Sequence, residues 1–268
     1  MNTLIIGANG QLGSELCKLI PHAKVIAHTD LDISDSSSLK NKLEEVEPEL
    51  IFNCAALTNV DKCQSDKDAA YHINSVPPQV IAAYCIKNNA RVVQFSTDYV
   101  FDGEKGMYTE EDIPNPINYY GLSKLLGDFA IFPLENSLII RTSGVFGEKM
   151  NFPRFVYSSL KEGKDVVAVD SFYSPINAKN LAKASFELEI KGLNGIINIA
   201  GERVSRYNMA LEIADFFSLD KTMVKRSKKM PKGIARRPLD SSLDISKAKS
   251  LLDWDFYTVE SNISILGH

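Results

Sequence analysis

The chain has 268 residues, of which 44% are hydrophobic and 24% charged, as in ordinary globular proteins. A formal charge of -4 argues against a nucleic-acid binder, whose affinity depends on neutralising phosphates. The cysteines form no C-x-x-C pair, the histidines form no metal-binding motif, and no apolar run approaches the roughly 20 residues of a membrane helix. We therefore expect a cytoplasmic protein without disulfides, a metal site or membrane contact.

Short apolar runs alternate with longer amphipathic stretches in the first half of the chain. The runs are rich in Val, Ile, Leu and Phe and predict strands, buried on both faces, at residues 3–6, 24–27, 50–54, 91–95 and 137–141. Helical patterns fall at residues 12–19, 37–45, 78–87 and 119–130. Because strands alternate with helices, the sequence predicts an α/β fold with a doubly wound parallel sheet of the Rossmann type.

A glycine-rich loop follows the first predicted strand and opens the first helix. Gly7, Gly10 and Gly13 are spaced to allow a tight turn, close approach of the backbone to a pyrophosphate, and close packing of helix on strand. Free N–H groups at the start of a helix favour phosphate charge. We therefore predict a cofactor site here that includes Gln11 and Leu12, with a purely structural turn as the alternative.

Residues after the next two strands extend this predicted site. Asp32, next to Ile33, resembles the adenine-contacting Asp of short-chain dehydrogenases/reductases. The alternative role for Asp32 is to cap the following helix, which Ser34 or Asp35 could do equally well. Ala55 and Ala56 are small enough to let a dinucleotide approach the backbone. No acid ends the second strand, although Asp30 follows closely, so NADP(H) is favoured and NAD(H) is the alternative.

Two Tyr-x-x-x-Lys pairs occur, Tyr120/Lys124 and Tyr157/Lys161. Residues four apart on a helix share a face, and an ammonium lowers the pKa of a nearby phenol from its usual value near 10. Such a Tyr suits proton exchange with a carbonyl or alcohol while a nicotinamide exchanges hydride. Chance produces this spacing often, so the position of each pair in the fold has to decide between them.

The position favours Tyr120 and Lys124. They follow the strand at 91–95, which we expect to flank, together with the strand at 3–6, the point where the strand order reverses and the cofactor lies. Thr97, at the end of that strand, is expected to hydrogen-bond the substrate carbonyl or to cap the loop. Tyr157 and Lys161 follow a strand that also ends in hydroxyls, but we interpret them as a surface helix turn.

The pattern loosens after residue 147. Helices are predicted at residues 152–161, 179–190, 205–217 and 246–252, and strands at 166–169 and 195–199. We assign residues 1–147 to a dinucleotide-binding domain to which 178–200 return. Residues 148–177 and 201–268 form a smaller substrate-binding cap. Eight basic residues and no acid lie between residues 221 and 237, and we interpret most of them as a solvated loop.

Several segments resemble those of one family, the dTDP-4-dehydrorhamnose reductases, which are extended short-chain dehydrogenases/reductases. The segments are T-N-V-D-K-C at 58–63, S-T-D-Y-V-F-D-G at 96–103, N-Y-Y-G-L-S-K at 118–124, R-T-S at 141–143, R-P at 237–238 and S-L-D at 242–244. They follow the family's order over nearly the whole chain. One position departs, because many members have Trp after R-T-S, packed on the substrate, where this chain has Gly144.

The resemblance implies reduction of the C4 ketone of dTDP-4-dehydro-L-rhamnose to dTDP-L-rhamnose. Tyr120 would donate the proton, Lys124 would lower the pKa of Tyr120 and hold the nicotinamide ribose, and Thr97 would orient the ketone. Further cofactor contacts would be Thr58 and Ser96. The residues implied to contact the nucleotide sugar are Val60, Asp98 and Tyr99 at the sugar and Arg237 at the diphosphate.

Gly144 leaves two alternatives open. One is a non-catalytic, NADP-binding regulatory subunit similar to the β subunit of methionine adenosyltransferase. The other is a reductase or epimerase of another nucleotide sugar. The intact set of Thr97, Tyr120 and Lys124 favours an enzyme. A homodimer is expected by analogy with such folds.

Overall fold

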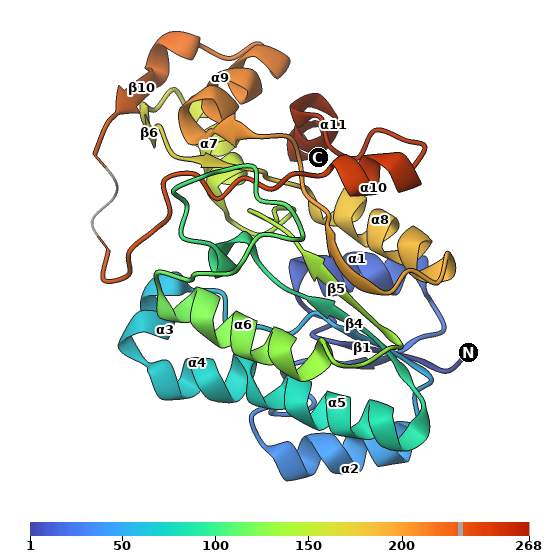
Figure 1. The fold of residues 1–268 in the computed structure, drawn as a ribbon. Coiled ribbons are helices and arrows are strands. Elements are labelled where there is room, and N and C mark those ends of the chain that lie inside the picture. Colours follow the sequence, from blue (N-terminus) through green and yellow to red (C-terminus); the bar gives the residue numbers. More distant parts are fainter. Residues whose placement is uncertain (230–232, 268) are drawn as a thin grey trace.

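Six parallel strands form the central sheet of the computed structural model, which describes residues 1–229 and 233–267 (Figure 1). In spatial order they are β2 (Lys24–Ile26), β1 (Thr3–Ile6), β3 (Leu50–Asn53), β4 (Arg91–Phe95), β5 (Ser137–Arg141) and β8 (Gly195–Asn198). The four inner strands are buried along their whole length, as expected for strands covered on both faces. The predicted Rossmann-type α/β fold is therefore confirmed.

The strand order reverses between β1 and β3. The expectation that the strands at 3–6 and 91–95 flank this point is wrong, because β3 lies between them and pairs with both. Residues 27–35 form turns and irregular backbone, so no further strand extends the sheet beyond β2 in the part of the chain described here. The carboxyl ends of β1, β3 and β4 nevertheless meet at one edge, where their loops share a site.

Helices cover both faces of the sheet (Figure 1). On one face α1 packs against α8, and on the other α2, α5 and α6 lie in a row. The bounds are α1 (Gln11–Leu19), α8 (Ala178–Ile190), α2 (Ser36–Val46), α5 (Val76–Asn88) and α6 (Tyr119–Ile131). Side chains of the strands alternate between two hydrophobic cores, with Ile5 and Phe52 in one and Leu4 and Ile51 in the other.

Two short helices that the sequence did not predict follow β3. They are α3 (Val60–Ser65) and α4 (Lys67–Asn74), and each begins at a side chain that caps its first turn. Asn59 accepts a hydrogen bond from the Lys62 amide, and Asp66 accepts one from the Ala69 amide. These helices bring the loop after β3 alongside the start of α6.

A third hydrophobic core holds the smaller lobe, at the top of Figure 1. Its helices are α7 (Phe152–Lys161), α9 (Arg206–Phe216) and α11 (Val259–Ile263). Strands β6 (Val166–Val169) and β10 (Val224–Ser227) pair in parallel, and β7 (Phe172–Tyr173) pairs with β9 (Val204–Ser205) in antiparallel fashion. The single turns η2 (Lys221–Met223) and η3 (Ser264–Gly267) complete the lobe. Residues 243–256, which include α10 (Ser246–Leu251), instead contribute Leu243 and Phe256 to a core of the sheet.

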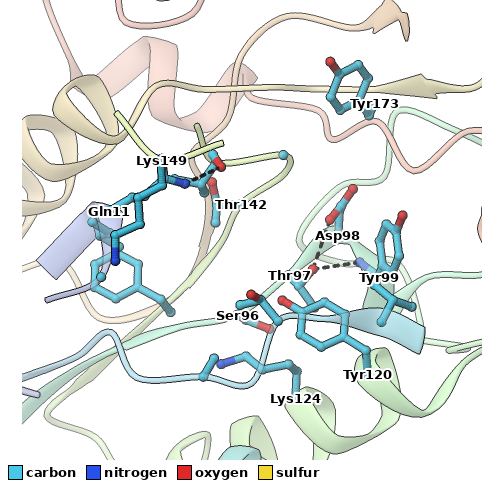
Figure 2. Close-up of a pocket in the computed structure, with 18 of the residues that line it drawn as sticks. Gln11, Ser96, Thr97, Asp98, Tyr99, Tyr120, Lys124, Thr142, Lys149 and Tyr173 are labelled. Carbon is cyan, nitrogen blue, oxygen red and sulfur yellow. Dashed lines mark hydrogen bonds between the residues drawn. The ribbon is translucent and has the colours of Figure 1, made fainter. Parts of the chain in front are cut away.

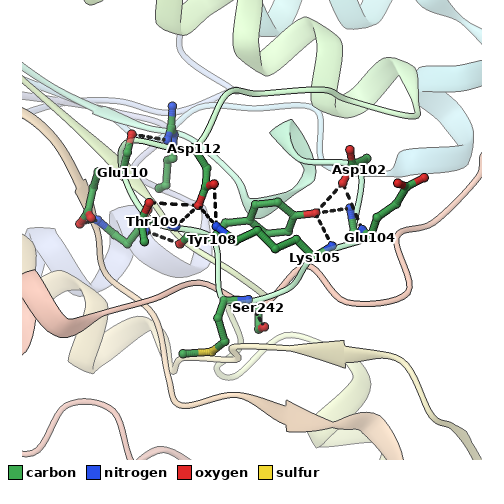
Figure 3. Close-up of polar contacts among 12 residues, drawn as sticks. Asp102, Glu104, Lys105, Tyr108, Thr109, Glu110, Asp112 and Ser242 are labelled. Atoms are coloured by element: carbon green, nitrogen blue, oxygen red, sulfur yellow. Dashed lines mark hydrogen bonds and ion pairs between the residues drawn. The ribbon is translucent and has the colours of Figure 1, made fainter.

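A loop after β4 ties the sheet to the C-terminal segment (Figure 3). The Tyr108 hydroxyl donates to Asp102 and accepts from the amide of Gly103 at 3.0 Å. The Met107 amide donates to the Ser242 hydroxyl at 2.8 Å, and the Tyr108 amide donates to the Ser242 carbonyl. These bonds fix the segment around residue 242 over the carboxyl edge of the sheet.

A buried ion pair joins β4 to the far end of α8. The Arg91 guanidinium donates to the Glu189 carboxylate, and both side chains are at most 10% exposed. Arg91 also donates to Asn136 at 3.0 Å, to Asn194, and to the Leu193 carbonyl at 2.6 Å. This network closes the end of the sheet opposite the site.

Within residues 1–229 and 233–267 no helix is long and apolar enough to cross a membrane. The same residues contain no group of three His, Cys, Asp or Glu side chains arranged to hold a metal ion.

Candidate active site

The glycine loop brings the backbones of β1, β3 and α1 into close contact. Gly7 has a φ of +84°, and a Cβ there would lie 2.8 Å from the Ala55 amide nitrogen. A Cβ on Gly13 would lie 2.2 Å from the Gly7 carbonyl oxygen. Gly10 precedes α1 without a side-chain cap, so the first amide groups of the helix are left for a ligand.

A cavity of about 270 Å³ opens beside this loop and is called the glycine cavity. Its lining residues are Gly7, Asn9, Gly10, Ile26, Ala27, His28, Leu31, Asp32, Ile33, Ala55, Ala56, Ile73 and Lys149. Asp32 accepts hydrogen bonds from the amide and hydroxyl of Ser34, which hold its pKa below the usual range, whereas Asp35 caps α2. Asp32 is therefore free of the capping role and remains at the cavity wall.

One face of α6 carries the ionisable groups of the site. Tyr120, Lys124 and Asp128 are spaced four apart and therefore lie on the same face. Burial lowers the pKa of Lys124, while the charges of Asp128 and Cys54 oppose this. Burial raises the pKa of Asp128 to about 6, against the attraction of Lys124 and a hydrogen bond from Ser96. Lys124 is thus a buried cation with its counter-charge one turn away.

Burial raises the pKa of Tyr120, and a hydrogen bond with Thr97 opposes the shift. The net direction is opposite to the expected lowering by Lys124, because burial of the phenol and the nearby Asp98 carboxylate both raise the pKa. A phenol with a raised pKa keeps its proton at neutral pH. It is suited to donate a proton rather than to remove one.

The residues after β4 form a turn against which the start of α6, with Tyr120, packs. Thr97 accepts a hydrogen bond from the Tyr99 amide at 3.2 Å and so begins the short turn η1 (Asp98–Val100), as the capping alternative predicted. Its hydroxyl donates to Asp98 at 3.0 Å. A Cβ on Gly121 would lie 1.9 Å from the Tyr99 carbonyl oxygen, so glycine lets α6 begin directly on this turn.

Asp98 is a buried carboxylate held by hydroxyl groups from three parts of the chain. Besides Thr97, Ser143 donates at 2.7 Å and Ser241 donates at 2.5 Å. Burial raises the pKa of Asp98, and these three hydrogen bonds oppose the shift. The carboxylate fixes Thr97 relative to β5 and the C-terminal segment.

These groups line a cavity of about 540 Å³, called the central cavity (Figure 2). Its lining residues are Gly10, Gln11, Leu12, Ala56, Thr58, Val60, Phe95, Ser96, Thr97, Asp98, Tyr99, Tyr120, Lys124, Thr142, Gly144, Val145, Lys149, Met150, Tyr173 and Arg206. Figure 2 shows Tyr120 and Lys124 on one side and Tyr173 across from them. The cavity thus joins the glycine loop, the α6 face and the smaller lobe.

A third cavity of about 340 Å³, the outer cavity, continues into the smaller lobe. Aromatic, apolar and cationic side chains dominate its wall, which is formed by Tyr99, Phe152, Phe155, Val167, Val169, Ser171, Phe172, Tyr173, Arg206, Arg237, Pro238 and Ser241. It shares Tyr99, Tyr173 and Arg206 with the central cavity, which in turn shares Gly10, Ala56 and Lys149 with the glycine cavity. The three cavities therefore form one row.

All the predicted site residues except Gly13 line this row of cavities. Gly13 lines none of the three cavities and serves the packing of α1 on the loop. Arg237 lines the outer cavity but donates to the Asp61 carboxylate at 2.8 Å. Tyr157 lines none of these cavities; it is half-buried on α7, packs on Phe217 at 4.6 Å and contacts the third core. Residues 230–232 of the basic stretch lie outside the described residues.

Lys149, Tyr173 and Arg206 are among the residues of the row that were not singled out from the sequence. Lys149 donates to the Asn9 carbonyl at 2.7 Å and so crosses the glycine loop from the segment after β5. The Arg206 guanidinium lies 4.4 Å from the centre of the Tyr173 ring. No sequence motif marks Lys149 or Arg206, whereas Gly144 was a signal for Tyr173.

Gly144 leaves space that Tyr173 fills. Gly144 has a φ of +51°, and a Cβ there would lie 2.8 Å from two carbons of the Tyr173 ring. A larger side chain at position 144 would therefore occupy the place of the ring. An aromatic ring from β7 therefore lies beside Gly144 at the wall of the central cavity.

Comparisons with known proteins cover the whole chain. Residues 1–264 match the family described as the RmlD substrate binding domain. A dTDP-4-dehydrorhamnose reductase of Aggregatibacter actinomycetemcomitans is 33% identical, over 91% of this chain and 90% of its own. The structure of a hypothetical dTDP-4-dehydrorhamnose reductase from Sulfolobus tokodaii is 48% identical, covers 96% of this chain and 97% of its own, and has a TM-score of 0.92.

A further solved structure was determined with a dinucleotide. It is the dTDP-4-dehydrorhamnose reductase of Bacillus anthracis in complex with NADP, which is 27% identical, with a TM-score of 0.91, over 100% of this chain and 99% of its own. The structural similarity therefore extends over both lobes.

Proposed function

The chain belongs to the dTDP-4-dehydrorhamnose reductase family, and on this premise we propose that it reduces dTDP-4-dehydro-L-rhamnose to dTDP-L-rhamnose with NADPH. The observation that carries the proposal is the row of three cavities with Tyr120 in the middle one. A dinucleotide entering from the glycine cavity and a nucleotide sugar entering from the outer cavity would meet at Tyr120.

The glycine loop fits a dinucleotide. Its backbone cradle has no room for side chains at Gly7 and Gly13. The first residues of α1, whose amide groups no side chain caps, line the central cavity. The nearby Asp30 carboxylate accepts a hydrogen bond from the Ala27 amide at 2.9 Å, so it is held within its own turn. His28 lies at the cavity wall in its place, which supports the preference for NADP(H).

The bound cofactor would supply a hydride to C4 of the sugar. Tyr120 donates its phenolic proton to the ketone oxygen, and Thr97 orients that oxygen by a second hydrogen bond. Lys124 would hold the nicotinamide ribose and would stabilise the tyrosinate that remains until a proton returns from solvent. The products are the alcohol at C4 and the oxidised cofactor, so hydride and proton are both accounted for.

The substrate nucleotide would extend into the outer cavity, with its diphosphate beside Arg206. The Arg206 guanidinium has no carboxylate within 4 Å among the described residues and lies over the faces of Tyr173 and Phe152. Arg237, the residue implied by the resemblance, is already paired with Asp61. We therefore place Arg206 nearer the phosphates and Arg237 at the rim.

The test is the loss of NADPH absorbance with dTDP-4-dehydro-L-rhamnose, compared with NADH. We expect stoichiometric conversion to dTDP-L-rhamnose and faster turnover with NADPH. Tight cofactor binding without turnover, together with a partner protein that co-purifies, would instead indicate the regulatory alternative. Turnover that conserves the cofactor would indicate an epimerase. A cytoplasmic location and a homodimer stay predictions from the sequence.

Lys149 provides a specific test of the cofactor path. Its ammonium lies between the glycine and central cavities, where the dinucleotide phosphates would pass. We expect Lys149→Met to weaken NADPH binding about five- to tenfold, because an exposed charge-assisted hydrogen bond is lost. Fluorescence titration measures the Kd, and the loss should shrink as salt increases. Lys161→Met, a change on α7 away from the row, is the control. An unchanged Kd in Lys149→Met would contradict this placement.

A further inference from the structure

Tyr173 stands where the central and outer cavities join. It comes from the two-residue strand β7 in the smaller lobe and lines both cavities. Only 5% of its surface is exposed. Its ring lies against Gly144 on one side and under the Arg206 guanidinium, so its position is fixed by packing.

The Tyr173 hydroxyl has no hydrogen-bond partner among residues 1–229 and 233–267. A buried hydroxyl without a partner is costly, because it gives up its bonds to water and gains none in return. Burial also raises the pKa of Tyr173 to about 12, so the group keeps its proton and is available as a donor. These properties indicate a hydroxyl that completes its hydrogen bond with a ligand.

The neighbours of Tyr173 define the chemistry of that ligand. Arg206 adds a positive charge at the same junction without a carboxylate to balance it within ion-pair distance in the described residues. The buried Asp98 carboxylate, on which the charge of Arg206 also acts, is already held by three hydroxyl groups. A phosphate oxygen fits a cation and a free O–H donor better than a carbonyl or an amide does.

We infer that Tyr173 binds the substrate, donating a hydrogen bond to an oxygen of the glycosyl diphosphate as it passes from the central to the outer cavity. The inference rests on the proposed function and deepens it. Gly144 is part of the same arrangement, because the absence of a side chain there is what admits the ring. Tyr173 and Gly144 together then set how far the sugar reaches towards Tyr120.

Tyr173→Phe tests this, since it keeps the ring and removes the hydroxyl. We expect the KM for dTDP-4-dehydro-L-rhamnose and the Kd for dTDP to rise about five- to tenfold, with kcat and the KM for NADPH within twofold. Tyr157→Phe is the matched control, a tyrosine packed on Phe217 outside the cavities. Thermal unfolding of each variant shows whether the fold is intact.

Gly144→Ala provides a second variant that leaves Tyr173 in the sequence. Its Cβ would meet the ring at 2.8 Å and displace it, so the KM for the nucleotide sugar should rise as well. Because both changes remove the same contact, their effects should not add in the double variant.

Suppose that the wild type turns over the keto sugar and that Tyr173→Phe has the same KM and the same affinity for dTDP as the wild type. This result would overturn the inference and leave the proposed function intact. A higher KM with unaltered dTDP binding would overturn the diphosphate assignment. If the wild type neither reduces the keto sugar nor binds dTDP, this result contradicts the proposed function, and the inference, which rests on it, is contradicted as well.

Discussion

Replacing Tyr120 with Phe is expected to lower kcat by about 10²- to 10⁴-fold, the usual contribution of a positioned proton donor. The change removes the phenolic proton and leaves the ring, so the contacts of α6 with the turn Asp98–Val100 remain. The raised pKa of Tyr120 means that the wild-type phenol is protonated over the neutral range, and activity there should not require its ionisation. Steady-state oxidation of NADPH measures the loss.

Cofactor binding separates this effect from a disturbed site. The Kd for NADPH, measured by fluorescence titration, should stay within twofold in Tyr120→Phe because Lys124 and the glycine loop are untouched. Tyr157→Phe is the control for removal of a tyrosine hydroxyl beside a lysine four residues on. If Tyr157→Phe lost activity and Tyr120→Phe did not, the assignment of the two Tyr-x-x-x-Lys pairs would be reversed.

Replacing Arg91 with Met is expected to lower the free energy of unfolding by about 3–5 kcal/mol, because it leaves the buried Glu189 carboxylate without its partner. For a chain of this size the loss corresponds to a fall in Tm of roughly 6–20 °C. Chemical denaturation measures the free energy, and calorimetry measures the Tm. The network lies at the end of the sheet away from Tyr120, so kcat at low temperature should be preserved.

The loss of stability in Arg91→Met is expected to depend on pH, in a direction set by the pKa of Glu189. Burial raises the pKa of Glu189, and Arg91 opposes this, so the pKa in the folded variant should rise further. A folded-state pKa above the unfolded one means that stability falls as pH rises between the two values. The deficit should therefore be smallest at and below the ordinary pKa of glutamate and should grow as pH rises above it.

A double change provides the control for the ion pair. Arg91→Met with Glu189→Leu removes both charges and should recover much of the lost stability. A single-variant loss below about 1 kcal/mol would show that water reaches Glu189 and that the pair is not effectively buried.

Hydrophobic runs were enough to locate the sheet. Strands such as Leu50–Asn53 and Ser137–Arg141 are buried along their whole length, and each has three consecutive apolar residues that are easy to recognise. The short elements were missed for the opposite reason. Strand β7 has two residues and helix α3 has six, too few to show a period, and tertiary contacts and capping side chains hold them in place.

The site was predictable where its residues follow the strands of the sheet. The Gly7 loop, Thr97 and Tyr120 each come at a fixed place relative to a strand or helix, and parallel strands bring their carboxyl ends together. Lys149, Tyr173 and Arg206 reach the cavities from elements whose placement depends on packing of the smaller lobe. Their spacing in the sequence carries no period or motif that reports this placement.

The hydroxyl groups around Asp98 have a consequence for how the protein is made. Ser241, one of its three donors, is 143 residues further along the chain. At roughly 5–20 residues per second, the ribosome adds it about 7–30 seconds after Asp98. The strand β8, which completes the sheet, also comes late, at residues 195–198. A nascent chain can form most of the sheet within that time. The Asp98 carboxylate, however, gains its third hydroxyl donor only when almost nine tenths of the protein has been made.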